Sequence, residues 1–311
     1  MNHCDLIFDM ETQDPDDFLT LILLCGHPKV NLKAVTLVPG SPYQIGLVKW
    51  LLAKFPKYSG IPVGYFDINC RHNSVSAWHY KSFGEIPPSY DASPASDIIS
   101  SIVQENPSII LLTGGPLKNI ANVIRNSNSE RPFALDTIVI QGGFAGTNIV
   151  PFEKQLSKFH GMKTCPTFNL GGDIPAARLV LESPLIRNKF LVSKNVCHGV
   201  TYNHKLHTHI GEIISHSLSS NTLHLQMIHS VMSQYRGEKK LHDPFAACCA
   251  INRAIGEFVE VEMYCERVTK KGYEWGARKV EYTTNTFIII DYDRSLFLQT
   301  FCDHLPEEGT K

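Results

Sequence analysis

The sequence predicts an α/β protein with a mostly parallel central sheet that is flanked by helices on both faces. Two observations support this class. Segments typical of strands alternate with segments typical of helices along the whole chain, and the first strand ends in acidic residues that lead directly into a helix. The chain has 311 residues, a length that suits one large α/β domain spanning residues 1–311.

The amino-terminal half begins with a short apolar run that ends in an acid. The helix that follows is expected to stop near Gly26 and Pro28. A polar, aromatic stretch over 67–93 interrupts the alternation, and we expect a long loop there. The expected strands are 5–9, 32–38, 61–66, 108–112 and 137–141, and the expected helices are 16–25, 44–55, 95–104 and 117–125.

The carboxy-terminal half continues the alternation less regularly. In parallel sheets the carboxyl ends of the strands form the binding site, so functional residues are sought where strands end. The expected helices are 175–181, 209–235, 244–255 and 295–304, and the expected strands are 189–192, 259–264, 277–282 and 286–291.

Composition excludes several classes of partner. The formal net charge of −1 argues against an electrostatic grip on nucleic acid or on an anionic membrane. No apolar run approaches the ~20 residues that a membrane span needs. The nine cysteines are scattered and contain no CxxC pair, which is typical of reduced thiols. With no recognisable signal peptide, we expect a cytoplasmic protein.

Five carboxylates crowd into the segment between the first strand and the first helix: Asp9, Glu11, Asp14, Asp16 and Asp17. Like charges at this spacing repel unless they are protonated or a cation lies among them. Ca²⁺ prefers such an all-oxygen shell. Helix capping by Asp14, followed by proline and two acids in the first turn, would explain three of the five residues. It would not explain acids at the end of a buried strand.

A second acidic position occurs in His242-Asp243-Pro244, which opens a helix. Taken alone, this segment is typical of a capping aspartate followed by proline at the first helical position. Beside the acidic cluster, Asp243 can complete a metal shell and His242 can give a proton to a leaving group.

Five segments match, in order and at plausible spacing, the motifs of one enzyme family. They are Asp9-x-Glu11 with Asp16-Asp17, Thr113 to Ile120, Gln141-Gly142-Gly143, Thr167-Phe168-Asn169 with Asp173 to Ala177, and His242-Asp243-Pro244. On these residues the chain resembles the inosine-uridine-preferring nucleoside hydrolases over nearly its whole length. The resemblance implies a nucleoside-hydrolase-like fold with a Rossmann-like core. It also implies a Ca²⁺-dependent N-ribosyl hydrolase that cleaves a ribonucleoside to ribose and free base.

The resemblance assigns the metal site residue by residue. Glu11, Asp17, Asp243 and the main-chain carbonyl of Thr113 would hold Ca²⁺. Glu11 would also activate water, although it stands where the family has aspartate, and one residue is inserted before Asp16-Asp17. Asp14 is therefore a rival for the water-activating role.

The resemblance also assigns the substrate contacts. Asp16 and Asn169 would hold ribose hydroxyls, and His242 would assist departure of the base. Carboxylates around the ribose would stabilise the positive charge of an oxocarbenium-like transition state. Ser41 stands where the family has an asparagine that contacts ribose, and Thr167 stands where it has a glutamate. These sugar contacts are therefore expected to differ.

The altered sugar contacts leave two alternative functions open. One is hydrolysis of a nucleotide or an ADP-ribosyl-type N-glycoside, which would need cations such as Arg71 and Lys81 to converge at the mouth of the site. The other is a catalytically silent nucleoside-binding protein, for which Glu11 and Ser41 would be the disabling changes.

Base selectivity is expected to come from Trp78, His79 and Tyr80 in the 67–93 loop and from the helix near 222–236. For the helix, apolar residues at core-facing spacing favour packing instead. Members of the family commonly form dimers or tetramers, so the resemblance also implies a homo-oligomer.

Overall fold

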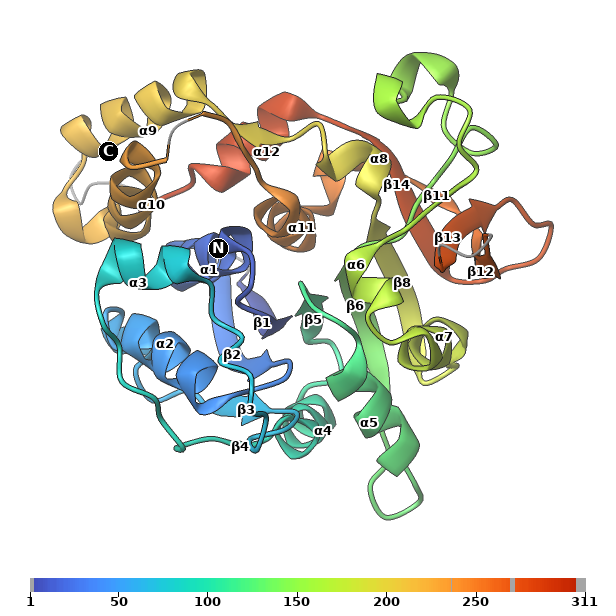
Figure 1. Ribbon diagram of the computed structural model, residues 1–311, viewed down its shortest axis with the longest axis horizontal. Coiled ribbons are helices and arrows are strands. Elements are labelled where there is room, and N and C mark those ends of the chain that lie inside the picture. The colour runs from blue at the N-terminus through green and yellow to red at the C-terminus, as the bar shows by residue number, and fades with distance from the viewer. Residues whose placement is uncertain (1–2, 236, 269–271, 306–311) are drawn as a thin grey trace.

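A nine-stranded sheet runs through the middle of the molecule (Figure 1). The computed structural model describes residues 3–235, 237–268 and 272–305. Neighbouring strands of this sheet pair in parallel, except for the antiparallel pair β11–β14 at one edge. The predicted fold class is therefore confirmed. In spatial order the strands are β11 (Gly256–Glu260), β14 (Thr286–Tyr292), β8 (Ile186–Val192), β6 (Leu135–Gln141), β5 (Ile110–Thr113), β1 (Cys4–Met10), β2 (Val30–Leu37), β3 (Val63–Tyr65) and β4 (Ser93–Pro94).

Two apolar cores cover the two faces of the sheet, because side chains alternate between the faces along each strand. In β1, Leu6 and Phe8 belong to one core and Ile7 to the other. Helices α1 (Pro15–Gly26), α10 (Leu223–Ser233), α11 (His242–Ile251) and α12 (Arg294–Phe301) contribute to the first core, and α4 (Ala95–Glu105), α5 (Lys118–Asn126) and α7 (Ile174–Glu182) to the second.

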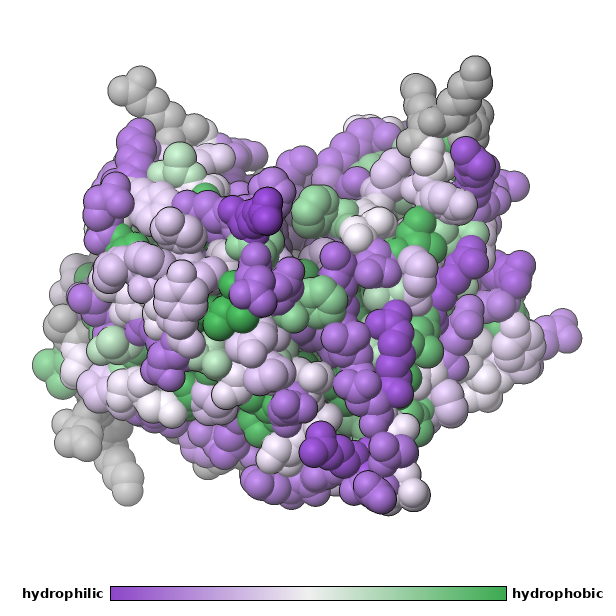
Figure 2. All heavy atoms as spheres, turned by 60° about the horizontal axis from the view of Figure 1, so that its bottom comes forward, coloured by the Kyte–Doolittle hydropathy of each residue, from purple (hydrophilic) through white to green (hydrophobic). Residues whose placement is uncertain are grey.

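Shorter elements complete the fold around these layers. Figure 2 shows one face of the molecule, on which polar residues predominate and apolar residues are scattered in small areas. No helix of the described ranges combines the length and hydropathy that a bilayer crossing requires. The remaining elements include α2 (Pro42–Leu52), α6 (Phe168–Gly171), α8 (Lys194–Cys197), α9 (His204–His216), β7 (Thr164–Cys165), β9 (Thr201–Tyr202), β10 (Lys239–Lys240), β12 (Glu262–Arg267) and β13 (Tyr273–Arg278).

Three predicted boundaries in the second half are wrong. The expected helix 209–235 is two helices, α9 and α10, with a turn of 3₁₀ helix between them. The expected strand 259–264 is parts of β11 and β12, which belong to different sheets. The expected strand 277–282 lies earlier, as β13, because antiparallel pairing with β12 sets its register.

The expected loop over 67–93 contains a helix, α3 (Ala77–Phe83). Its aromatic side chains pack on α1 and α2, since the Phe83 ring lies 5.2 Å from the Phe18 ring and 5.1 Å from the Trp50 ring. These partners are distant in sequence, and the Ser76 side chain makes no capping hydrogen bond. Local sequence therefore carried little sign of the helix.

The topology creates a crevice beside β1. Strand β1 lies between β2, the next strand in sequence, and β5. The chain thus continues from β1 toward one edge of the sheet and later returns to the other side of β1. Asp9 lies opposite Thr113 in the parallel register, and the Gly114 N–H donates to the Asp9 carbonyl over 2.8 Å. Ligands bind at such a switch point, outside the carboxyl ends of the strands.

The α3 helix buries His79 completely. Its ring packs edge-on against Phe18 at 5.2 Å, and its Nδ1 lies 2.9 Å from the Ser76 hydroxyl. Burial lowers the pKa of His79 to about 4. The imidazole is therefore neutral in the folded protein at neutral pH.

We predict that His79 contributes to acid destabilisation. Because its pKa is lower in the folded state than the ordinary value of 6.5, stability is complete above about pH 6.5 and falls as pH drops toward 4. The wild type should lose unfolding free energy when the pH falls from 7.5 to 5. In His79→Leu this loss should be smaller by about 1–2 kcal/mol. Urea denaturation at the two pH values measures this. The same pH dependence in His79→Leu as in the wild type would contradict the prediction. The control is His160→Leu, at an exposed position.

Candidate functional site

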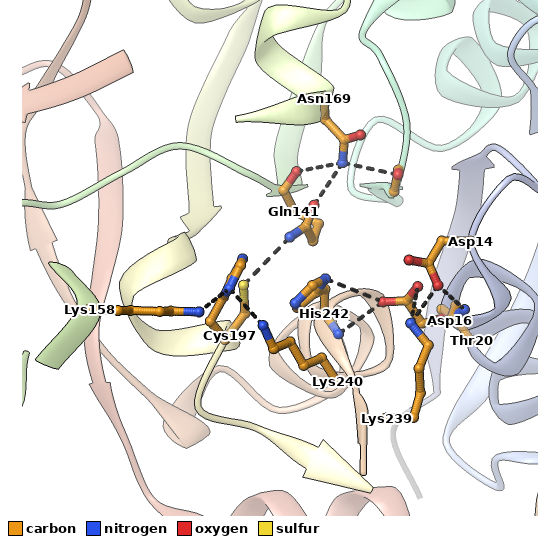
Figure 3. A network of polar contacts seen from close by, with 12 residues as sticks. Asp14, Asp16, Thr20, Gln141, Lys158, Asn169, Cys197, Lys239, Lys240 and His242 are labelled. Atoms are coloured by element: carbon orange, nitrogen blue, oxygen red, sulfur yellow. Dashed lines mark hydrogen bonds and ion pairs between the residues drawn. The ribbon is translucent and has the colours of Figure 1, made fainter. Parts of the chain in front are cut away.

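A cavity of about 400 Å³ opens where β1, β5, β6 and α8 meet. Carboxylates form much of its lining, together with two histidines, a lysine and several uncharged groups. Figure 3 shows a network of polar contacts that includes the lining residues Asp14, Asp16, Gln141, Asn169 and His242. The cavity therefore collects most of the residues predicted from the sequence. The lining residues are Glu11, Gln13, Asp14, Asp16, Asp17, Gly114, Gln141, Gly142, Thr167, Phe168, Asn169, Lys194, His198, His242 and Asp243.

Three buried carboxylates converge in this cavity. Ligand oxygens of Asp16, Asp17 and Asp243 all lie within 4.8 Å of one another. Burial, reinforced by the neighbouring carboxylates, raises the pKa of Asp17 and of Asp243 well above the ordinary range. The Asp243 Oδ1 atom is buried without a hydrogen-bond partner. Buried charge of this kind requires either protons or a cation.

Gly114 brings the backbone against these carboxylates. A Cβ atom at this position would lie 2.8 Å from the Asp17 Oδ1 and 3.0 Å from the Asp243 Oδ1. Only glycine leaves this space free, so the peptide that joins Thr113 to Gly114 lies beside both acids. The oxygen-only donor set fits a hard cation such as Ca²⁺.

Glu11 extends from the end of β1 into the cavity. Its N–H donates to the Asp17 Oδ1 over 3.2 Å, and its Oε2 accepts from the Gln13 N–H over 2.8 Å. Burial, with a contribution from the Asp14 carboxylate, raises the pKa of Glu11 to about 7. Glu11 thus lies directly beside the converging acids.

Asp9 lies two residues before Glu11, within the last part of β1. Its Oδ1 accepts hydrogen bonds from the Thr36 hydroxyl over 2.5 Å and from the Asn119 amide over 2.7 Å. Asp9 is not in the cavity lining. It ties β1 to β2 and α5 below the cluster.

Capping explains part of the acidic segment, as the sequence allowed. Asp14 is the N-cap of α1 and accepts from the Asp16 N–H over 3.5 Å, with Pro15 at the first helical position. Asp243 is different, because Leu241 is the N-cap of α11 and Asp243 lies in its first turn. The capping alternative therefore holds for Asp14 and is wrong for Asp243.

Lys239 is a site residue that sequence reasoning missed. Its ammonium makes ion pairs with Asp14 and, over 3.3 Å, with the Asp16 Oδ1. The side chains of Lys239 and Asp16 are 9% and 1% exposed. Burial opposes the charge on Lys239, but Asp16 and Asp14 outweigh it and raise the pKa of the ammonium. The Asp16 Oδ2 accepts from the His242 N–H over 3.1 Å, so both Asp16 oxygens have partners.

Asn169 joins the ends of two strands at the top of the view in Figure 3. Its Nδ2 donates to the Gly114 carbonyl over 3.0 Å and to the Gln141 side-chain oxygen over 2.7 Å. Thr167 precedes it, lines the cavity, and has a buried hydroxyl without a hydrogen-bond partner.

His242 and His198 form a stacked pair in the cavity wall, with ring centroids 4.5 Å apart. The His242 Nδ1 lies 3.6 Å from the Asp16 Oδ2, and its buried Nε2 has no hydrogen-bond partner. Burial and the Lys239 ammonium lower the pKa of His242 to about 4. Its imidazole is neutral at neutral pH and can still donate a hydrogen bond.

Two residues predicted to contact substrate lie outside this lining. Ser41 is the N-cap of α2 in a capping box with Gln44, and its hydroxyl donates to the Asn73 carbonyl over 2.5 Å. His79, a residue of α3, packs against Phe18 of α1 as described above. Neither side chain borders the cavity.

Three basic residues of the site were not predicted: Lys194, His198 and Lys239. Signals for them exist in the sequence. Lys194 and His198 follow the end of β8, and Lys239 precedes His242 by three residues. Strand ends and the approach to a histidine-aspartate pair are the places where site residues gather.

Comparisons with known proteins find relatives along nearly the whole chain. The family model described as inosine-uridine preferring nucleoside hydrolase matches residues 6–299. An uncharacterised protein of Aquifex aeolicus is 27% identical, over 93% of this chain and 95% of that protein. The pyrimidine-specific ribonucleoside hydrolase RihA of Salmonella arizonae is 23% identical, over 94% and 96%. A solved inosine-guanosine nucleoside hydrolase, 18% identical, shares the fold with a TM-score of 0.68 over 98% of this chain and 100% of that one.

We predict that Lys239 holds the acidic segment together. Lys239→Met would leave Asp16 buried without its cation, and removing one member of such a pair typically costs about 3–5 kcal/mol of unfolding free energy. Chemical denaturation measures the loss. The matched control is Lys240→Met, at the exposed neighbouring position, for which we expect a change below about 0.5 kcal/mol. Equal effects of the two substitutions would show that the ion pairs do not stabilise the fold.

Proposed function

The chain belongs to the inosine-uridine preferring nucleoside hydrolase family and is thus an N-glycosyl hydrolase, and we propose that it is a Ca²⁺-dependent N-ribosyl hydrolase. It would cleave the bond between ribose and base to give a free base and a sugar. One observation carries the metal part of this proposal: Asp17 and Asp243 converge, buried, beside a glycine whose missing side chain leaves room between them.

Four groups are proposed to hold the cation: Glu11, Asp17, Asp243 and the carbonyl of Thr113. Their donor atoms are all oxygens, and the unpartnered Oδ1 of Asp243 supports the assignment. Ca²⁺, when bound there, supplies positive charge that offsets the carboxylates and draws ribose hydroxyls and water to them.

Glu11 is proposed to take the proton from the attacking water. It lines the cavity, and its Oε2 is held by the Gln13 N–H. The rival, Asp14, caps α1 and pairs with Lys239, so its carboxylate already serves two structural contacts. These contacts favour Glu11 over Asp14.

The remaining cavity residues are proposed to bind the two halves of the substrate. Asn169 and Asp16 would contact the ribose hydroxyls beside the metal ligands, and Thr167 would lie close to the sugar. The neutral imidazole of His242 would donate a hydrogen bond to the departing base. The proton of this imidazole would assist the departure of the base. Carboxylates around the ribose would stabilise the positive charge that develops on the ring.

Asp243→Asn tests the metal site with a readout besides activity. In EDTA the variant should unfold at a higher temperature than the wild type, because one of the repelling buried carboxylates is gone. Added Ca²⁺ should raise the unfolding temperature of the wild type and have little effect on the variant, and Ca²⁺-dependent base release should be lost. The control is Asp97→Asn on the exposed surface of α4. Unchanged Ca²⁺ stabilisation in Asp243→Asn would refute the ligand assignment.

Glu11→Gln and Asp14→Asn separate the two candidates for water activation. At saturating Ca²⁺ we expect Glu11→Gln to lower kcat by about 10²–10⁴-fold, the usual contribution of general base catalysis. Asp14→Asn should change kcat by less than about tenfold and lower the stability instead. Free-base release followed by chromatography gives both values. The reverse order of effects would transfer the role to Asp14.

A further inference from the structure

A group of lysines surrounds His198 at the wall of the cavity. The Lys158 ammonium donates to the His198 Nδ1 over 2.6 Å, and the Lys240 ammonium lies 3.4 Å from the same atom. Lys158 and Lys240 reach this point from opposite directions in Figure 3. Of the three lysines, Lys194 lines the cavity beside His198, whereas Lys158 and Lys240 contact His198 from outside the lining. The Lys194 ammonium donates to the Pro166 carbonyl over 2.7 Å. We call Lys158, Lys194, Lys240 and His198 the basic wall.

The basic wall lacks countercharges. Among the residues described, no carboxylate lies within ion-pair distance of the ammonium groups of Lys158, Lys194 or Lys240. Other lysines of the same region are paired. Lys154 contacts both Glu257 and Asp291. Three converging ammonium groups without a carboxylate are typical of a site for a bound anion.

The protonation of the basic wall agrees with this assignment. Burial and the neighbouring Lys240 lower the pKa of Lys158 to about 8, so the two ammonium groups repel each other. The His198 Nδ1 accepts from Lys158, which leaves the proton of a neutral ring on Nε2. His198 can therefore donate to an anion through Nε2. The same cations disfavour a metal ion at Cys197, His198 and His242.

The cavity therefore has two chemically different parts. Asp17 and Asp243 provide negative charge, and Lys194 and His198 provide positive charge and a hydrogen-bond donor. Thr167, next to the Lys194 contact at Pro166, is uncharged where the family has a glutamate. An acid at this position would attract the ammonium groups and repel an anion. A ligand that matches both parts carries a diol at one end and an anionic group at the other.

We propose that the substrate is a ribonucleoside 5′-monophosphate, with its phosphate bound by the basic wall; this inference rests on the function proposed above. A phosphomonoester carries a charge of about −1.5 to −2 at pH 7, more than a single carboxylate. Lys194 and His198 would contact it in the cavity, and the ammonium groups of Lys158 and Lys240 at His198 would add positive charge. The 2′ and 3′ hydroxyls are assigned to the acidic part of the cavity, so the 5′ position remains for phosphate. Water breaks the C1′–N bond, its hydroxyl joins C1′, and the base leaves with the proton, giving ribose 5-phosphate.

The cations come from a different part of the chain than the sequence suggested. Arg71 and Lys81 were the expected phosphate contacts, but neither lines the cavity. Lys194 does line it, and Lys158 and Lys240 contact the lining residue His198. The basic wall is built instead from the segment before β7, from α8 and from β10, which only the folded chain brings together.

The test compares kcat/KM for a panel of nucleosides and their 5′-monophosphates in the wild type and three variants. Lys194→Gln and the double variant Lys158→Gln/Lys240→Gln remove charge from the basic wall. Lys154→Gln, outside the cavity and already paired with acids, is the matched control. We expect the wild type to prefer monophosphates by at least about tenfold, since charge-assisted hydrogen bonds contribute about that factor each or more. Both basic-wall variants should lose this preference, because kcat/KM for the monophosphates should fall at least about tenfold more than kcat/KM for the nucleosides.

Calorimetric titration with ribose 5-phosphate and with inorganic phosphate provides a readout that does not need turnover. We expect wild-type and Lys154→Gln protein to bind ribose 5-phosphate, and the basic-wall variants to bind it at least about tenfold more weakly. If nucleosides are cleaved as well as monophosphates by every variant, the inference fails and the proposed function stands. If nothing is cleaved but ribose 5-phosphate binding depends on the basic wall, the proposed function fails and the anion site stands. Binding of inorganic phosphate without any preference for monophosphates overturns the substrate assignment.

Discussion

The structure depends on how it accommodates several carboxylates buried at the ends of β1 and β5. Each buried carboxylate loses hydration free energy, and each neighbouring acid adds repulsion. The protein compensates differently for different members. Asp9 has hydrogen bonds from Thr36 and Asn119, and Asp16 has an ion pair with Lys239. Asp17 and Asp243 have no cation of the protein within ion-pair distance in the ranges described.

Lys239 thereby divides the acidic segment into two functional parts. The two acids that pair with Lys239, Asp14 and Asp16, also anchor the start of α1 and the backbone of His242. The pair without such a cation, Asp17 and Asp243, lies against Gly114, where a side chain would meet both carboxylates. A single lysine on a two-residue strand thus separates the acids that hold the site together from the acids proposed to bind the metal.

The sequence predicted the parts of the site that are close together along the chain or belong to recognisable motifs. Glu11, Asp16, Asp17 and Asp243 were found in this way, and so was the parallel sheet, because alternation is a local pattern. Lys239 and His198 were missed because their positions depend on β10 pairing with β9 and on where β8 ends. His79 was expected to face a base, but contacts with Phe18 from a distant helix order α3 and enclose the ring. Tertiary packing thus decided what local sequence left open.

The basic wall changes how the altered family positions are interpreted. Taken alone, threonine at 167 and serine at 41 could indicate a weakened or silent site. Ser41 caps α2 and lies outside the cavity lining. Serine in place of the family's asparagine therefore removes the expected ribose contact and adds no new group to the cavity. Thr167 differs, because it lies in the lining one residue after the carbonyl that holds Lys194. A glutamate there would compete with a bound anion for these ammonium groups. Under the substrate proposed above, an uncharged residue at 167 and three lysines without a carboxylate partner in the described ranges both favour a sugar that carries an anionic group.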